Sequence, residues 1–284
     1  MEHEDKITIV IISHRSEENV LRFISGLSDK YNILVIDNSG DEVLKKKVEH
    51  KTNVQFHLTE NKGYGAAINY ANNLVNTNYF FVFNPDILNI DDKFIDDFDI
   101  KAKYLNGDFL CMGPRFLNVN SKSHKQSDIN KKIAKISAIN GACMFINKKY
   151  FNLLNGFDEN FFLFFEENDF CKRGVKKGFK IYQINEIEVT HKSGSSVETN
   201  DDMQKKQLEY LRNWHFIWSK FYFKKKHHGF LLTLIFFSPI FIRTILRIII
   251  YSIKKKKEKK KKYTVRLDAL ISSLRGENSK KRII

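Results

Sequence analysis

The sequence predicts an α/β fold with a mainly parallel central sheet, followed by a C-terminal helical segment that associates with a membrane. Two observations predict the sheet: short β-branched runs alternate with segments of helical spacing, and an aspartate lies just past the end of two of these runs. Such alternation is typical of parallel sheets with crossover helices. A third observation, a 24-residue apolar run between lysine clusters, predicts the C-terminal segment.

Strands and helices alternate through the first third of the chain. We expect strands at Lys6–Ser13, Asn32–Ile36, Val54–Leu58 and Tyr79–Phe83, and helices at Glu17–Leu27, with Ser16 as its cap, and at Gly63–Val75. Right-handed crossovers place the C-termini of parallel strands at one edge of the sheet, where ligands bind. Asp37 and Asp86 follow strand ends and are therefore expected at that edge.

The second half of the chain has a less regular pattern. We expect strands at Phe109–Leu117, Ile136–Ile146 and Phe179–Ile184, a polar loop at Asn118–Lys132, an aromatic run at Phe161–Phe165, and helices at Phe170–Lys177 and Asp202–Phe223. The composition then changes at Lys224. The predicted domains are a catalytic domain over residues 1–223, a membrane-associating segment over 224–262 and a basic tail over 263–284.

The net charge of +15 belongs to the C-terminal fifth of the chain. Residues 224–284 contain 18 basic and 3 acidic residues, whereas residues 1–223 contain 30 of each. This distribution argues against nucleic acid as a partner and for a basic appendage. The acidic N-terminus MEHEDK is unlike a signal peptide, and three widely spaced cysteines suit reduced thiols. We therefore expect a cytoplasmic protein.

Two aspartates at strand ends are candidate ligand-binding residues. Asp37, in VIDNS, can accept hydrogen bonds from a nucleoside, although the same residues also form ordinary turns. Asp86, in FNPD, can hold Mg²⁺ or Mn²⁺ against a diphosphate, because hard cations prefer oxygen ligands. A proline-stiffened turn is the alternative there. His191 is a further metal candidate if the fold brings it near Asp86.

A glycine-rich stretch lies between the third strand and the following helix. In NKGYGAA, Asn61 and Gly63 are candidate ligand-binding residues, because small residues let the backbone approach a ligand and helix N-termini attract phosphate. The alternative is a tight turn before a packed helix.

An acidic cluster follows the aromatic run. Glu166, Glu167 and Asp169 repel one another and are flanked by apolar residues, and both effects raise a carboxyl pKa toward that of a general base. The alternative is a solvated acidic helix start favoured by the helix dipole.

Eight stretches together resemble glycosyltransferase family 2, and within it the rhamnosyltransferase-like enzymes of bacterial surface-polysaccharide synthesis. They are TIVIISHRS, VIDNSGD, ENKGYGAAIN, FVFNPDI, CMGPRFL, NGACMFI, GFDENFFLFFEENDFCKR and THKSGSS, in the family's order over roughly residues 6–196. The resemblance implies a GT-A fold, a divalent cation (Mg²⁺ or Mn²⁺) and a nucleoside-diphosphate-sugar donor.

The resemblance also implies roles for individual residues. Ser13 and Asp37 would contact the nucleoside, and Asp86 would bind the metal with His191 as a further contact to metal or diphosphate. Asn84 stands where many relatives carry the first acid of the metal motif. Glu167 would be the catalytic base, with Glu166 and Asp169 as alternatives. The implied reaction is a single displacement with inversion at the anomeric carbon.

The implied function is sugar transfer, with rhamnose as one candidate, to a polysaccharide or lipid-linked acceptor at the cytoplasmic face of the inner (plasma) membrane. A catalytically inactive sugar-nucleotide-binding or scaffold protein is the alternative, because Asn84 replaces an acid. A nucleic-acid binder driven by the lysine run is a third possibility, which the balanced charge of residues 1–223 disfavours.

The apolar run Phe230–Ile253 is interrupted by Arg243 and Arg247, which leaves an uncharged stretch too short to span a bilayer. Pro239 is expected to kink it, and the spacing of Pro239, Arg243, Arg247 and Tyr251 predicts one polar stripe on a helix. Lysines on both sides favour an interfacial or re-entrant helix on an anionic membrane surface. A single membrane span and a buried core helix with a solvated tail are the alternatives.

Overall fold

The structure, a computed structural model, describes residues 7–118, 126–192, 197–199, 201–279 and 281–282. The chain divides into two compact units, Met1–Asp158 with Glu167–Glu198, and Glu159–Glu166 with Thr199–Ile284. Residues 1–6, residues 119–125 of the predicted polar loop and residues 193–196 of the THKSGSS stretch lie outside the described residues. The units divide at Glu198, upstream of the boundary that the sequence predicts at Phe223.

The first unit contains one sheet, which within the described residues has nine strands in the order β3-β2-β1-β4-β8-β6-β9-β5, with β7 beside β9. The strands are β1 (Thr8–Ser13), β2 (Asn32–Asp37), β3 (Val54–Leu58), β4 (Tyr79–Phe83), β5 (Ile87–Leu88), β6 (Cys111–Phe116), β7 (Ile133–Lys135), β8 (Cys143–Asn147) and β9 (Ile181–His191). Strands β1 to β4 are parallel, and β8 joins them antiparallel. The mainly parallel sheet confirms the predicted fold class.

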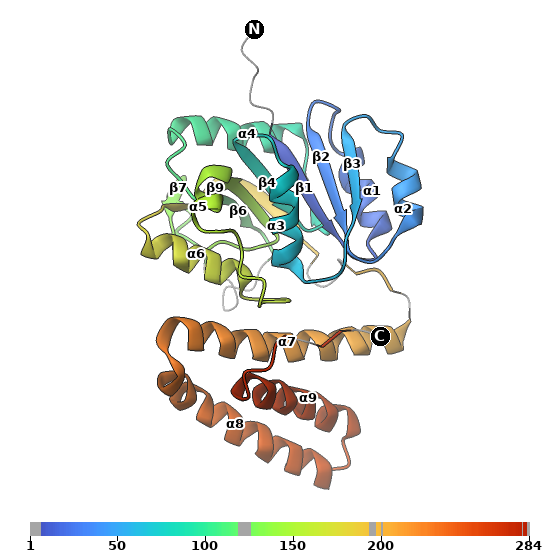
Figure 1. The fold of residues 1–284 in the computed structure, drawn as a ribbon, viewed down its shortest axis with the longest axis vertical. Coiled ribbons are helices and arrows are strands. Elements are labelled where there is room, and N and C mark those ends of the chain that lie inside the picture. The colour runs from blue at the N-terminus through green and yellow to red at the C-terminus, as the bar shows by residue number, and fades with distance from the viewer. Residues whose placement is uncertain (1–6, 119–125, 193–196, 200, 280, 283–284) are drawn as a thin grey trace. The chain divides into compact units, whose positions relative to one another are not determined.

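Helices cover both faces of this sheet (Figure 1). They are α1 (Glu17–Ser25), α2 (Glu42–Val48), α3 (Tyr64–Leu74), α4 (Asp92–Tyr104), α5 (Lys148–Leu153) and α6 (Glu166–Lys176). Alternate residues of the central strands enter two separate cores, so Ile9 and Phe81 pack with α1, α2 and α4, whereas Val10 and Phe80 pack with α3, α5 and α6. Because both faces are buried, the central strands are almost continuously apolar.

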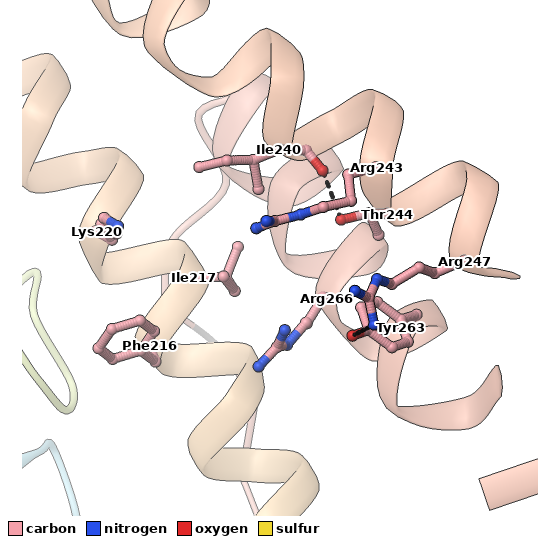
Figure 2. A pocket seen from close by; sticks show the side chains of 9 residues that line it. All are labelled: Phe216, Ile217, Lys220, Ile240, Arg243, Thr244, Arg247, Tyr263 and Arg266. Carbon is pink, nitrogen blue, oxygen red and sulfur yellow. Dashed lines mark hydrogen bonds between the residues drawn. The ribbon is translucent and has the colours of Figure 1, made fainter. Parts of the chain in front are cut away.

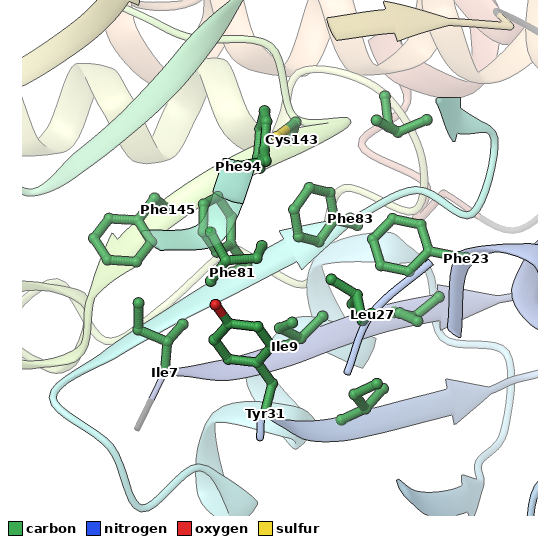
Figure 3. Packing of buried hydrophobic residues seen from close by; sticks show 14 of the residues in the cluster. Ile7, Ile9, Phe23, Leu27, Tyr31, Phe81, Phe83, Phe94, Cys143 and Phe145 are labelled. Carbon is green, nitrogen blue, oxygen red and sulfur yellow. The ribbon is translucent and has the colours of Figure 1, made fainter. Parts of the chain in front are cut away.

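The first of these cores is rich in aromatic rings (Figure 3). Phe81 of β4 packs against Phe83, Phe98 and Phe145, with ring centroids 4.7–5.0 Å apart. Large rings in such offset and edge-on contacts bury more apolar area per residue than aliphatic side chains do. They fix β4, whose C-terminal end carries the candidate metal residues.

The structure corrects several predicted elements. The strand predicted at Ile136–Ile146 begins only at Cys143, because residues 136–142 form an irregular loop at the edge of the candidate site. Ser16 occupies the cap position of α1, but its hydroxyl donates to the carbonyl of His14 instead of capping the helix. Helices α2, α4 and α5 were not predicted.

The second unit is built on three helices, α7 (Asp202–His228), α8 (Phe230–Ile253) and α9 (Lys257–Leu274). Its core contains Trp214, Ile217, Trp218 and Phe221 of α7 together with residues of α8 and α9. The indole of Trp214 donates to Asp268 at 2.8 Å. Residues 263–274 of the predicted basic tail form the second part of α9.

Helix α8 has one partly packed side and one exposed apolar side. Phe237 and Thr244 are buried, whereas a row at helical spacing is exposed and includes Leu232, Ile235, Ile242, Leu246 and Ile253. Helix α8 is the one helix in the described part of the chain that is long and apolar enough to cross a membrane. Pro239 lies inside this helix, which continues on both sides of it.

Candidate active site

The carboxyl ends of the parallel strands meet at one edge, as the sequence predicts. Ser13, the last residue of β1, lies in register with Asp37, the last residue of β2, and Asp37 pairs with Leu58 of β3. Both polar side chains are fully buried. The register brings the two residues proposed for nucleoside binding next to each other.

Asp37 holds the loop that follows it. Its Oδ1 accepts hydrogen bonds from the backbone N–H groups of Ser39 (2.9 Å) and Asp41 (3.1 Å), and the Ser39 hydroxyl lies 3.0 Å from each carboxylate oxygen. This is the turn role that the sequence leaves open for DNS. Of these groups, Oδ2 contacts only the Ser39 hydroxyl, which can rotate away. Oδ2 can therefore still accept a hydrogen bond from a ligand.

A cavity of about 300 Å³ opens beside this loop, lined by Arg15, Glu17, Ser39, Asp41 and Glu198. The backbone N–H of Arg15 donates to the Ser39 hydroxyl at 3.0 Å, and Arg15 adopts a left-handed φ of 51°. The Ser13 hydroxyl is buried without a hydrogen-bond partner among the described residues. Arg15 is not among the predicted site residues, although its position two residues after the first strand places it at the edge where ligands bind.

Asp86 is fully buried three residues beyond β4. The guanidinium of Arg22 on α1 donates to the carbonyl of Pro85 at 3.0 Å and thereby fixes the turn. Strand β5 then pairs with β9 so that Ile87 lies opposite His191. The imidazole Nε2 of His191 consequently lies 3.2 Å from Asp86 Oδ1, which meets the condition that made His191 a metal candidate.

The second oxygen of Asp86, Oδ2, has no hydrogen-bond partner in the described structure. A buried carboxylate oxygen without a partner is costly unless a cation or proton donor completes it. A carboxylate and an imidazole suit a divalent transition-metal ion or Mg²⁺. The described residues contain no cluster of three or more His, Cys, Asp or Glu side chains that could hold a metal, so these two would supply only part of its ligands.

The glycine-rich stretch places the N-terminus of α3 in the same region. Gly63 has a φ of 108°, which only glycine adopts readily, and α3 begins at the next residue without a side-chain cap. Asn61 is half-buried in the preceding loop. The hydroxyl of Tyr64, in the first turn of α3, donates to the carbonyl of Gly141 at 2.8 Å. The uncapped N–H groups of α3 are thus available to a phosphate.

The irregular loop Asn140–Ala142 connects the other site residues. The backbone N–H of Asn84 donates to the carbonyl of Ala142 at 2.9 Å. A Cβ added to Gly141 would lie 3.3 Å from both Cβ and Cγ of Glu167. This loop therefore touches the end of β4, the start of α3 and the start of α6, and it brings Glu167 to the edge that carries Asp86.

Glu167 has the electrostatic character of a general base. Burial raises the pKa of its carboxyl group to about 7, against the opposing effect of hydrogen bonds from the backbone N–H groups of Glu167 and Asn168. The side-chain amide of Asn168 also donates to Glu167 Oε1 at 2.6 Å. A carboxyl with such a pKa is well matched to accepting a proton near neutral pH.

The two neighbouring acids differ from Glu167. Asp169 is fully buried and accepts a hydrogen bond from Arg173 Nε at 2.7 Å, while the same guanidinium donates to the carbonyls of Leu154 and Gly156 at 2.6 Å. Asp169 thus anchors a structural network. Glu166 is buried and belongs to the second compact unit.

The backbone just before these acids is strained. Phe164 and Phe165 have φ values of 68° and 70°. Two consecutive bulky residues in the left-handed region cost free energy, and such conformations concentrate at functional sites. The strain marks the approach to Glu167 as a constrained segment.

Comparisons with known proteins show similarity to glycosyltransferases. Residues 8–98 match the family model described as Glycosyl transferase family 2. The hexosyltransferase Agl10 of low-salt glycan biosynthesis in Haloferax volcanii is 24% identical over 212 residues, which cover 66% of this chain and 67% of that protein. The rhamnosyltransferase WbbL of Escherichia coli is 22% identical over 221 residues, covering 65% of this chain and 83% of WbbL.

Solved structures share the fold at low sequence identity. The mannosyltransferase PcManGT from Pyrobaculum calidifontis, in complex with GDP-Man and Mn²⁺, superposes with a TM-score of 0.59 at 12% identity and covers 96% of this chain and 88% of its own. TarS of S. aureus, in complex with UDP-GlcNAc, gives a TM-score of 0.54 at 13% identity, with coverage of 98% and 94%. Residues 8–98 are thus similar to glycosyltransferase family 2, and the fold is the GT-A fold.

Proposed function

We propose that this protein transfers a sugar from a nucleoside-diphosphate sugar to an acceptor hydroxyl, with inversion at the anomeric carbon. The proposal is carried by the observation that two features lie at the same edge of the sheet. One is the Asp86–His191 pair, in which Asp86 Oδ2 has no hydrogen-bond partner among the described residues. The other is Glu167, whose carboxyl pKa is about 7. An inverting transferase requires one site for the diphosphate and one base for the acceptor.

Glu167 would remove the proton from the acceptor hydroxyl as its oxygen forms a bond to the anomeric carbon. The bond between that carbon and the donor's diphosphate breaks in the same displacement, so no covalent sugar–enzyme intermediate is needed. A divalent cation, when bound by Asp86 and His191, would offset the negative charge of the departing diphosphate.

Each part of the donor has a proposed contact. Ser13, Asp37 and the cavity beside Arg15 would receive the nucleoside. The backbone around Asn61 and Gly63, with the uncapped start of α3, would contact the phosphates. Asn84 would lie beside the metal residues through its backbone bond to Ala142, without contributing the charge of an acid.

The relatives support a proposal for the sugar and the acceptor. A hexose or a deoxyhexose such as rhamnose is proposed as the transferred sugar, because the relatives include a hexosyltransferase and a rhamnosyltransferase. A polysaccharide or lipid-linked glycan is the proposed acceptor. The exposed apolar side of α8 and the lysines beside it support work at the cytoplasmic face of the inner membrane, in peripheral or re-entrant contact with anionic lipid.

A thermal-unfolding screen of nucleotide sugars with Mn²⁺ tests the donor proposal. A donor at 100 times its dissociation constant stabilises the folded protein by about 2.7 kcal/mol. We expect at least one nucleotide sugar to raise the unfolding temperature, and to do so less without Mn²⁺. If none of the common donors changes the unfolding temperature, the proposed function is wrong.

A further inference from the structure

The second unit contains a cavity of about 290 Å³ lined by residues of α7, α8 and α9 (Figure 2). Four of its lining residues are basic, namely Lys220, Arg243, Arg247 and Arg266, and Ile217 and Ile240 are among the others. The lining contains no Asp or Glu within the described structure. Positive charge is therefore concentrated in a partly apolar enclosure.

The contacts of the three arginines leave their charges without a counter-ion. Arg247 donates to the hydroxyl of Tyr263 at 2.9 Å, and Arg266 donates to the side-chain oxygen of Asn213 at 3.0 and 3.2 Å. Both partners are neutral. Arg243 makes no hydrogen bond or ion pair to any residue in the described ranges, and Figure 2 shows its side chain at the cavity.

The cavity is electrostatically unfavourable when it holds no anion. The pKa of Lys220 is lowered by burial first and then by the positive charges of Lys224 and Arg243. Like charges held together at a partly buried site cost free energy unless an anion is present. An arrangement of this kind fits a ligand with more than one negative charge, and guanidinium groups match phosphate oxygens in geometry.

The surroundings of the cavity indicate where such an anion comes from. Helix α8 supplies Arg243 and Arg247 to the cavity and exposes its apolar row, which includes Ile242 and Leu246, to the outside. A soluble phosphate compound needs no such surface, whereas a lipid presents a phosphate directly beside hydrocarbon. We propose that this cavity binds the terminal phosphate of a membrane lipid whose hydrocarbon chain lies along the exposed side of α8.

The lipid site rests on the membrane contact in the proposed function, and it does not depend on the transfer reaction. Its test therefore contains no sugar donor. Full-length protein is incubated with phosphatidylcholine vesicles that carry either phosphatidic acid, which has a terminal phosphate, or phosphatidylglycerol, which has a phosphodiester, at equal surface charge. We expect about tenfold tighter binding to the phosphatidic acid vesicles, the weight of one or two charge-assisted hydrogen bonds.

Two double variants remove the same charge from different places. Lys220→Gln with Arg243→Gln should abolish the preference for phosphatidic acid without lowering the unfolding temperature, because neither side chain has an acidic partner among the residues that the structure describes. Lys254→Gln with Lys257→Gln, both exposed, should weaken binding to the two vesicle types equally and keep the preference. The single variant Arg243→Gln provides the same comparison if the double variant unfolds.

Three outcomes would overturn the lipid site. One is a parent protein without preference between the charge-matched vesicles. Another is a cavity variant that is folded and retains the preference. The third is that glycerol 3-phosphate, which has the phosphate but no hydrocarbon, competes as well as phosphatidic acid does; the ligand would then be a soluble phosphate. A protein inactive on all nucleotide sugars but selective in this assay would leave the lipid site standing.

Discussion

Glu167 and Asp169 are two acids of one turn that the structure uses differently. Arg173 pairs with Asp169 and satisfies two backbone carbonyls, so this acid belongs to the architecture. Glu167 lacks such a cationic partner in its described contacts, and burial alone raises its pKa to about 7. Mutual repulsion of the acids, one of two causes that the sequence suggests, is not needed to explain the shift. This difference supports Glu167 as the proposed proton acceptor.

Replacement of Glu167 should change turnover far more than donor binding. We expect Glu167→Gln to lower kcat by about 10²-fold or more, the usual effect of losing a general base, because the base contacts the acceptor and not the nucleotide. In the parent enzyme, kcat/KM should fall about tenfold per pH unit below a pH of about 7, as Glu167 becomes protonated. Steady-state kinetics against pH measure both. A larger loss in Glu166→Gln would move the role by one residue.

The raised pKa of Glu167 also predicts a pH dependence of stability. The folded protein holds this proton up to a pH of about 7, whereas the unfolded chain releases it near 4.5. The contribution of Glu167 to the free energy of unfolding is thus fully present below 4.5 and is lost as pH rises toward 7. Glu167→Gln should remove this loss. The free energy of unfolding of the variant minus that of the parent should therefore be larger at pH 8 than at pH 5, by at most about 3 kcal/mol. Denaturant unfolding at the two pH values measures the difference, and an unchanged difference would mean that Glu167 is solvated.

Asp86→Ala should abolish metal-dependent donor binding and leave the protein folded. The variant loses the contact of Oδ1 with His191 but also removes the buried Oδ2, which has no hydrogen-bond partner among the described residues, so the unfolding temperature without metal should change little. Asp108→Ala, which removes an exposed carboxylate paired with Lys180, is the matched control and should bind donor normally. Calorimetric titration with donor and Mn²⁺ provides the measurement. Normal metal-dependent binding by the Asp86 variant would show that the cation is held elsewhere.

The loop Asn140–Ala142 shows how elements distant in sequence form the site. It contacts β4 through Asn84, α3 through Tyr64 and α6 through Glu167. The sequence predicts the parallel strands within about two residues, because each is a short apolar β-branched run with a clear end. It predicts a single strand over Ile136–Ile146, because Ile136 and Ile139 are typical strand residues. In the structure, residues 136–142 are irregular and the strand begins at Cys143, since only pairing with distant segments determines where the strand starts.

The same limit applies to the other parts of the site. Asp86 could be placed at the strand edge from its own neighbourhood, but its contact with His191 depends on β5 pairing with β9 across 105 residues of chain. Helices α2 and α4 are rich in charged residues, and their few apolar positions gave no clear helical period. The role of Asp169 is equally hidden in the sequence, since the carbonyls that its partner Arg173 also binds, those of Leu154 and Gly156, lie just after α5.

Gly141→Ala tests whether this loop positions Glu167. The added methyl group would lie 3.3 Å from Glu167 Cβ and Cγ, which is closer than ordinary van der Waals contact, so the side chain must move by a few tenths of an ångström. We expect kcat to fall by up to about 10²-fold, as for small misplacements of a catalytic group, with donor affinity unchanged. A variant that is folded and fully active would show that the loop does not set the position of Glu167.

At the scale of the whole molecule, neither compact unit is a single continuous stretch of the chain. Segment Glu159–Glu166 joins the C-terminal helices, where the Ser219 hydroxyl donates to the carbonyl of Leu163 at 2.8 Å and the Arg282 guanidinium lies 3.6 Å from the Phe162 ring centroid. Covalently, the same segment leads directly into Glu167. The unit with the exposed apolar helix is thus connected in sequence to the proposed catalytic base.

Truncations should distinguish the two possible boundaries. Ending the chain after Phe223 leaves Trp214, Trp218 and Phe221 without their partners in α8 and α9, so we expect this form to aggregate. Ending it after Glu198 removes the whole cluster and exposes mainly the phenylalanines between Phe161 and Phe165 that contact α7, so it should aggregate less. Both forms should lose sedimentation with anionic vesicles. Size-exclusion chromatography compares them, and a monodisperse 1–223 form with an aggregated 1–198 form would support the boundary at Phe223.

The most direct test of a transferase centred on Glu167 and Asp86 is the release of nucleoside diphosphate from the donor identified by thermal unfolding. With Mn²⁺, the parent protein should release it slowly to water and faster with acceptor, Asp86→Ala should lose the metal dependence, and Glu167→Gln should bind donor but release about 10²-fold less. Donor that binds tightly to the parent without any release, with or without acceptor, would contradict catalysis and indicate a sugar-nucleotide-binding protein. Release that is unchanged in Glu167→Gln would contradict the assigned base.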